Sequence, residues 1–289
     1  MNCLQHLLRS VFFTCILLLL LGHLTDAVSG EAPLPAITDS QLIALNPLEW
    51  LRSILWPPPK KPPVNVGVPS GGRRDGGGTS GFCPAVSVHP SVVVALVPTP
   101  ADAYQPFGQT TSGHPTFWFY VPYQGKRLAE FVLIDEQEND VYNSGIFTID
   151  QSQIPGIIGV KLPDKVPPLQ VGKQYRWIFS IVCSRSDRSG DMTVNGWIQR
   201  IEPDKNLQNQ LSQAQSSTDK LLLLARNGIW FDALTPLMEL RRQQPSPTLD
   251  QIWGYLLESI QTGRDAKDID GLGKSPISSC CGLNQQPAR

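Results

Sequence analysis

Short apolar segments, each closed by a proline or a polar turn, recur through residues 92–201 and constrain the fold more than any other feature of the chain. Several are β-branched or aromatic, and others alternate apolar with polar residues, as strands do when one face packs on a core. Regular spacing of this kind favours an antiparallel β-sandwich. We expect about seven strands, within 92–98, 115–122, 129–136, 141–149, 155–163, 174–183 and 191–201.

Past Glu202 the apolar residues recur at the spacing of a helix. Three packed C-terminal helices are expected, over 204–228, 229–243 and a last segment that ends near Ile260 and begins with a capping box at Thr248 and Gln251. The last two would form a hairpin that resembles one unit of a tetratricopeptide repeat. Because a single unit cannot bury its faces alone, we expect the helices to pack on the sandwich, which makes the fold class α+β.

Residues 1–30 have the composition of a secretory signal peptide, because Arg9 precedes an apolar run over 11–21 and small residues follow at Ala27 and Gly30. The run is shorter than the roughly twenty apolar residues that span a bilayer. We expect cleavage after Gly30 and export to the periplasm or the cell exterior. Contact with a membrane is expected only through this segment, if it stays uncleaved.

Composition divides the rest of the chain. Residues 31–81 hold the runs PPPKKPP and PSGGRRDGGGTSG, which predict a leader and linker; the sandwich follows over 82–202, the helical extension over 203–262 and a polar tail over 263–289. The glycine-rich run lacks the lysine and the preceding strand of a phosphate-binding loop. A formal net charge of -1 gives no pull toward nucleic acid, and we expect no cofactor.

Six cysteines are present, of which Cys3 and Cys15 lie in the signal segment, leaving Cys83, Cys183 and the adjacent Cys280 and Cys281. An exported chain keeps its disulfides, and three pairings are possible. We expect Cys83 to pair with Cys183, since each borders a predicted strand. No metal site is expected, because the only histidines of the mature chain stand at His-Pro steps and no C-x-x-C spacing occurs.

Several sequence blocks, in order, resemble one known family: GGGTSGFC, HPTFWFYVPY, AEFVLIDEQENDVY, PPLQVGKQYRWIFSIVC and NGIWFDALTPLMELRR. This is a cyanobacterial exported family catalogued as a domain of unknown function, number 928 in its series. The resemblance extends from about Gly76 to about Ile260. It implies export, an all-β core and a helical tail, and it implies no catalytic residues. The leader around Trp50 departs from the family.

Aromatic side chains are the first candidates for binding. Residues 117–120 are consecutive aromatics, so Trp118 and Tyr120 must share the strand face opposite Phe117 and Phe119. If that face is exposed, Trp118, Tyr120 and the nearby Tyr123 would suit stacking on sugar rings or a protein interface; the alternative is that the helices cover it. Two further candidates for protein contacts lie in the helical segments, Trp230 and Trp253.

Charged clusters give weaker hypotheses. Asp135 and Glu136 could act as the paired carboxylates of a hydrolase, although carboxylates in a turn are more often solvated. The loop over 183–191 is expected to be a polar hairpin whose Asp and Ser side chains bond to their own backbone. The sequence therefore favours a non-catalytic module that binds another exported or envelope protein. The alternatives are a carbohydrate-binding module of the cell envelope or, less favoured, an envelope hydrolase.

Overall fold

Two β-sheets and a set of C-terminal helices make up the described part of the protein. The computed structural model describes residues 93–99, 105–260 and 272–279, so the predicted signal segment and the leader lie outside the described residues. Among the described residues, one sheet has the strand order β1-β3-β6-β9 and the other β2-β8-β7-β4-β5. The strands span β1 Val94–Ala95, β2 Phe107–Thr110, β3 Thr116–Val121, β4 Arg127–Asp135, β5 Asp140–Ile149, β6 Gly156–Lys161, β7 Gln174–Val182, β8 Met192–Arg200 and β9 Ile277–Ser279.

The sheets are mixed, which corrects the prediction of a purely antiparallel sandwich. All seven predicted segments contain a strand, but β2 and β9 were not predicted, and each pairs in parallel, β2 with β8 and β6 with β9. Both additions are short, and β2 carries a glycine in the sequence FGQT, so neither has the apolar alternation that marks a strand. The segment 263–289, predicted as a polar tail, therefore supplies an edge strand.

Aromatic rings from facing strands fill the space between the sheets. Phe119 of β3 stacks on Phe179 of β7, with ring centroids 4.2 Å apart. The ring centroids of Phe117 and Phe131 of β4 are 4.8 Å apart, and Trp177 of β7 is fully buried beside these two rings. Offset and edge contacts of this kind add to the free energy of burial, so this cluster holds the two sheets together.

Within the described residues four α-helices follow β8, one more than predicted: α4 Lys205–Gln213, α5 Ser217–Arg226, α6 Trp230–Gln243 and α7 Pro247–Ile260. The segment predicted as the first helix forms two helices, α4 and α5, because Ser216 and Asp219 form a capping box that starts α5. The capping box predicted at Thr248 is wrong. Helix α7 begins at Pro247, and the Ser246 hydroxyl accepts the Leu249 N–H at 3.3 Å.

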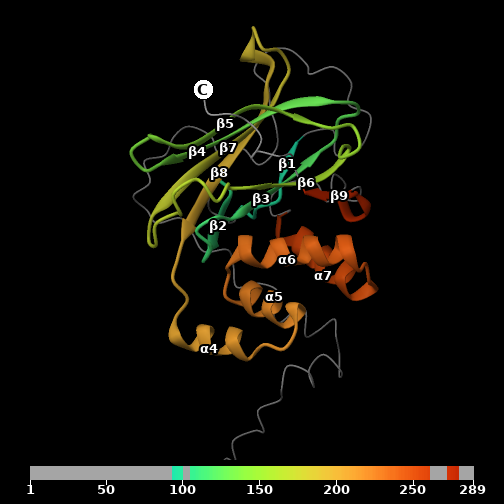
Figure 1. Ribbon diagram of the computed structural model, residues 1–289. Helices are drawn as coiled ribbons and strands as arrows, with labels where there is room; N and C mark the ends of the chain where they lie inside the picture. Colours follow the sequence, from blue (N-terminus) through green and yellow to red (C-terminus); the bar gives the residue numbers. More distant parts are fainter. Residues whose placement is uncertain (1–92, 100–104, 261–271, 280–289) are drawn as a thin grey trace, which may run out of the picture. The chain divides into compact units, whose positions relative to one another are not determined.

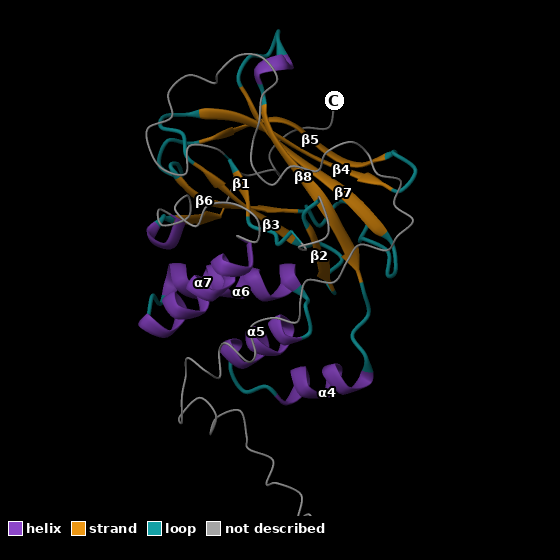
Figure 2. Cartoon of the chain, turned by 180° about the vertical axis from the view of Figure 1, so that it is seen from behind, coloured by secondary structure: helices purple, strands orange, loops and turns teal. Residues whose placement is uncertain are grey.

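The helices lie on one side of the sheets, with α6 and α7 nearest to them, α5 next and α4 farthest away, as Figures 1 and 2 show from opposite sides. Helix α6 contacts β2 and β3, α5 contacts α6, and α4 contacts α5. The Phe231 ring of α6 lies 5.3 Å from that of Phe117, so α6 reaches the aromatic core. The expectation that the helices pack on the sandwich is confirmed. No helix among the described residues has the length and apolar character to cross a membrane.

Candidate functional site

The aromatic face proposed for ligand stacking is buried, which corrects that expectation. Trp118, Tyr120 and Tyr123 retain 3%, 2% and 0% of their surface. Helix α6 covers the ring of Trp118, whose Nε1 donates to Thr235 Oγ1 at 3.2 Å. Burial raises the pKa of Tyr123 to about 12. A ring that stacks on sugar needs an open face, so these three residues form part of the core instead.

The two helical tryptophans are also interior residues, each with 1% of its surface exposed. Trp230 Nε1 donates to the Leu96 carbonyl at 2.7 Å and so links α6 to the segment after β1. Trp253 Nε1 donates to the Leu272 carbonyl at 3.4 Å, beside the short 3-10 helix η3 Leu272–Lys274. Both were predicted as binding contacts, and both instead attach the helices to the rest of the fold.

One of the predicted disulfide cysteines, Cys183, follows β7. It is disulfide-bonded, and its Sγ lies 3.0 Å from the Gly190 carbonyl oxygen. Its predicted partner Cys83 lies outside the described residues, as do Cys280 and Cys281. The pairing of Cys83 with Cys183 therefore stays a prediction.

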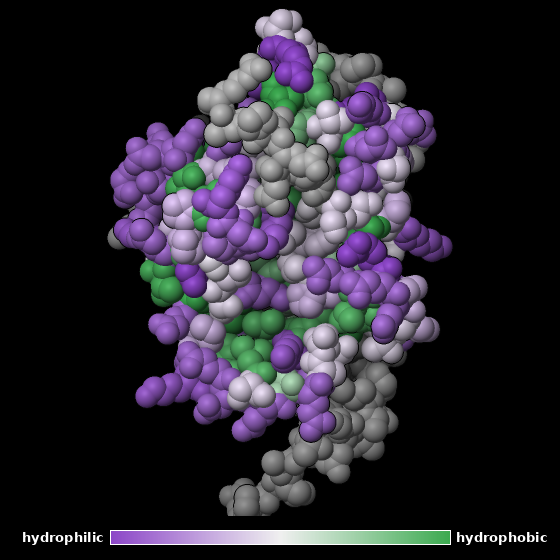
Figure 3. Space-filling model, viewed as in Figure 1, coloured by the Kyte–Doolittle hydropathy of each residue, from purple (hydrophilic) through white to green (hydrophobic). Residues whose placement is uncertain are grey.

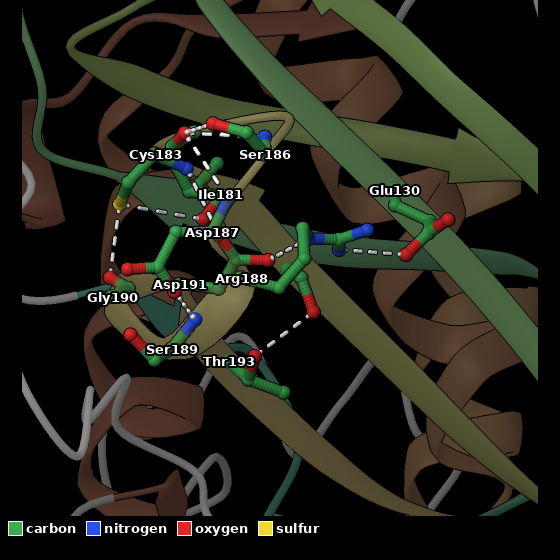
Figure 4. A network of polar contacts seen from close by, with 12 residues as sticks. Glu130, Ile181, Cys183, Ser186, Asp187, Arg188, Ser189, Gly190, Asp191 and Thr193 are labelled. Atoms are coloured by element: carbon green, nitrogen blue, oxygen red, sulfur yellow. Dashed lines mark hydrogen bonds and ion pairs between the residues drawn. The ribbon is translucent and has the colours of Figure 1, made fainter.

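The loop after Cys183 is a self-bonded polar hairpin, in the manner that its sequence predicts (Figure 4). Asp187 caps the 3-10 helix η1 Arg188–Gly190 by accepting the Ser189 N–H at 3.0 Å. Arg188 donates to Asp191 and, at 2.8 Å, to Glu130 Oε2 on β4. The hydrogen bond to Glu130 and, to a smaller extent, that to Asp191 raise the pKa of Arg188 above its usual value. The charges of Arg188 and Asp191 are paired within the chain, which gives this part of the loop a structural role.

A cleft of about 300 Å³ lies where the β4–β5 turn meets the chain that leads from β6 into β7. Pockets of this size take small ligands or single side chains. The predicted acidic pair, Asp135 and Glu136, lines it together with a proline-rich wall that sequence reasoning did not identify. The lining residues are Asp135, Glu136, Gln137, Val141, Pro167, Pro168, Leu169, Gln170, Lys173, Gln174 and Tyr175.

Backbone hydrogen bonds hold the proline-rich wall in place. The Leu169 N–H donates to the Gly113 carbonyl at 3.0 Å, and the Gly172 N–H donates to the Arg200 carbonyl at 2.7 Å. The Gln170 N–H donates to the phenol oxygen of Tyr175 at 2.9 Å. A wall fixed in this way loses little conformational entropy when a ligand binds, so the cleft is preorganised.

Hydrogen bonds also occupy the two carboxylates. Asp135 Oδ1 accepts the backbone N–H groups of Gln137 and Asn139, each at 2.9 Å, and the Asn139 side chain donates as well. These hydrogen bonds hold the pKa of Asp135 below its usual value of 3.8, and those from Asn139 have the largest effect. Glu136 Oε1 accepts the Gln174 N–H at 3.1 Å. A general acid needs a raised pKa, so Asp135 is unsuited to the role that the hydrolase hypothesis gives it.

Gln174 is the polar residue of the cleft that the fold leaves incompletely bonded. It retains 6% of its surface, and its Oε1 is buried with no hydrogen-bond partner among the described residues. Such an oxygen is costly to bury, because it gave up its bond to water on folding. The sequence signal for it was weak: a glutamine at the entry of a strand, after a proline-rich turn.

The described residues contain no group of three or more His, Cys, Asp or Glu side chains that could hold a metal ion. Apolar side chains gather over the helices on the face seen in Figure 3, and Leu223, Leu224 and Leu240 are half-buried. Val171 is the large apolar residue that the described chain exposes most, at 52%.

Comparison with known proteins gives one match. A family model described as Domain of Unknown Function (DUF928) matches residues 70–268, about two thirds of the chain. This confirms the family resemblance predicted from the sequence blocks, while the cyanobacterial source stays a prediction. No curated protein and no solved structure matches.

Proposed function

The chain belongs to the DUF928 family, a domain of unknown function, and we propose that it is a non-catalytic module that binds another exported or envelope protein. The observation that carries this proposal is the cleft between the β4–β5 turn and the proline-rich wall. Its rigid walls and its buried acceptor on Gln174 suit recognition of a protruding segment of a partner.

The charge state of the cleft favours binding over hydrolysis. Asp135, with its lowered pKa, is ionised at neutral pH and accepts hydrogen bonds from the turn that it closes. Glu136 accepts a backbone amide from β7. Both carboxylates thus fix the walls of the cleft. The carbohydrate alternative is less favoured, because the aromatic residues chosen for it are buried.

A selection from a random peptide library displayed on phage tests the proposal. The mature chain should enrich peptides that compete with one another for a single site. Val141→Trp, which places a large ring in the cleft wall, should weaken their binding by about tenfold or more, equivalent to about 1.4 kcal/mol. Thr148→Trp is the matched control, since Thr148 is exposed on the same strand and does not line the cleft.

The selection has two outcomes that refute the proposal. One is that the mature chain enriches no peptide. The other is that Val141→Trp and Thr148→Trp, both folded by circular dichroism, bind the enriched peptides as well as the wild type does.

We also propose that the protein works outside the cytoplasm, in the periplasm or beyond. The basic residue, apolar run and small residues of positions 1–30 support this. N-terminal sequencing of the protein from its native cells should find Glu31 at the start of the mature chain. An intact Met1 in the cytoplasmic fraction would refute export.

A further inference from the structure

The side-chain amides that neighbour Gln174 across the sheet make their hydrogen bonds to other groups. Gln174 pairs across the sheet with Gln199, which pairs in turn with Gln109 of β2. Gln199 Oε1 accepts the Gln109 side chain at 3.0 Å, and Gln199 Nε2 donates to the Gly172 carbonyl at 3.4 Å. Neither of these amides donates to Gln174 Oε1, which is buried without a hydrogen-bond partner among the described residues.

The charged groups of the cleft favour a positively charged ligand. Asp135 and Glu136 contribute two negative charges, and Lys173 contributes one positive charge, so the lining carries a net charge of -1 (one positive minus two negative). Lys173 Nζ stands 3.8 Å from Glu136 Oε2, and its side chain is 52% exposed. An exposed pair at this separation is weak, so a second cation can share the carboxylate.

Part of the cleft lining is aliphatic. Pro167 and Pro168 on one wall and Val141 on the other present carbon surface to the cleft, which Leu169, with 1% of its surface exposed, also lines. Long basic side chains pack their methylene groups on apolar surface while the charged end reaches polar groups. The cleft thus offers both surfaces that such a side chain requires.

We propose that the cleft binds an arginine or lysine side chain of the partner protein, with the Gln174 side chain turning toward the cleft so that its Oε1 accepts a hydrogen bond from the cationic end. The carboxylate of Glu136 provides the compensating charge, and the prolines contact the methylene stem. This inference rests on the proposed function as a protein-binding module, and it adds the chemical class of the side chain that is recognised.

Titration of the isotope-labelled mature chain with small blocked amino acids tests the proposal by NMR. The probes are the N-acetyl methylamides of arginine, lysine, norleucine and glutamate. Arginine and lysine should shift the Gln174 side-chain amide and the backbone amides of Gln170 and Lys173. Norleucine, which has the stem without the charge, should bind about tenfold more weakly, since a hydrogen bond to a charged group contributes about 1.5 kcal/mol or more.

Two substitutions at Gln174 should change the affinity for arginine in opposite directions. Gln174→Leu removes the acceptor and should weaken arginine binding about tenfold, whereas Gln174→Glu adds a negative charge and should strengthen it. Gln210→Leu is the control, because Gln210 is an exposed glutamine on α4 that does not line the cleft and takes no part in the row of glutamines on the sheet. It should leave arginine binding unchanged. Thermal unfolding verifies that each variant is folded.

The results separate this inference from the proposed function. If phage-selected peptides bind in the cleft but contain no essential basic residue, and norleucine shifts Gln174 as strongly as arginine, the basic side chain is refuted and protein binding stands. If neither peptides nor probes affect the cleft, both are refuted. Weaker arginine binding by Gln174→Glu than by the wild type would also contradict the inference.

Discussion

Asp232, at the start of α6, accepts the backbone N–H of Thr111 through Oδ2 at 2.8 Å. The same carboxylate accepts the hydroxyl groups of Thr111 and Thr110, the latter fully buried at the end of β2. A helix side chain thus takes three hydrogen bonds from one strand end. This contact joins two parts of the chain that are more than a hundred residues apart, and it fixes the helical extension on the sandwich.

Asp232→Ala should destabilise the protein by about 3 kcal/mol, because it leaves the Thr110 hydroxyl and the Thr111 amide without an acceptor. Urea unfolding followed by circular dichroism gives the free energy. Glu239→Ala, an exposed position on the same helix, is the control and should change stability by less than about 0.5 kcal/mol. Equal effects of the two variants would contradict the role of Asp232.

Gly159→Ala should destabilise the sandwich by about 1–3 kcal/mol through overpacking. Gly159 lies opposite Trp118 in the β3–β6 pair, and an added Cβ would come within 2.8 Å of the Trp118 ring. That ring is buried beneath α6 and has no room to move. Gly254→Ala on α7 has open space around it and should be neutral or stabilising. Differential scanning calorimetry compares the two; a harmless Gly159→Ala would contradict the packing argument.

Tyr123→Phe should preserve or raise stability, by up to about 1 kcal/mol, because the Tyr123 hydroxyl is buried without a partner among the described residues. Burial raises the pKa of Tyr123 from 10.0 to about 12, so the unfolded chain loses this proton first. The contribution of the protonated Tyr123 phenol to the free energy of unfolding is complete below pH 10 and is lost as pH rises toward 12. Alkaline unfolding should therefore show a fall in wild-type stability over this range that is smaller in Tyr123→Phe. A destabilised variant would indicate a partner for the hydroxyl.

Asp135→Asn should weaken the β4–β5 turn at neutral pH, where the ionised carboxylate accepts hydrogen bonds from Asn139 and Gln137. Those bonds lower the pKa of Asp135 below 3.8, so its contribution is present above that pH and is lost as pH falls through the folded-state pKa. The stability difference between wild type and variant, measured by urea unfolding from pH 7 to pH 2, should shrink in acid. Thr148→Ala, at an exposed position of the same hairpin without an ionisable group, should show no such change. A constant difference would contradict the prediction.

The sequence predicted the elements with strong local patterns. Aromatic and β-branched alternation located β3, β4 and β7, and the Asn227–Gly228 stop located the end of α5. The two-residue alternation also placed Phe117 and Trp118 on opposite faces of β3, which the structure confirms. The break before α5 was available in the Ser216 and Asp219 capping box, although the longer apolar pattern obscured it.

The candidate site was predictable only in part. Asp135 and Glu136 were identified from their position in a hairpin, but their partners come from a segment some thirty residues later, whose prolines and Gln174 carry no motif. The tryptophans chosen for binding were buried instead, because aromatic composition is the same for a core residue and for an exposed one.

Local chemistry in the sequence determined seven of the nine described strands and the helical character of the segment that follows β8, since side-chain periodicity acts within a few residues. Tertiary structure alone decided the rest. The parallel pairing of β2 with β8 and of β9 with β6, the helix that covers Trp118 and the buried acceptor without a partner on Gln174 all depend on residues distant in the chain. Exposure and unsatisfied hydrogen bonds are properties of the packed whole, and for this protein they place the candidate site in the cleft beside Gln174 rather than on its aromatic strand.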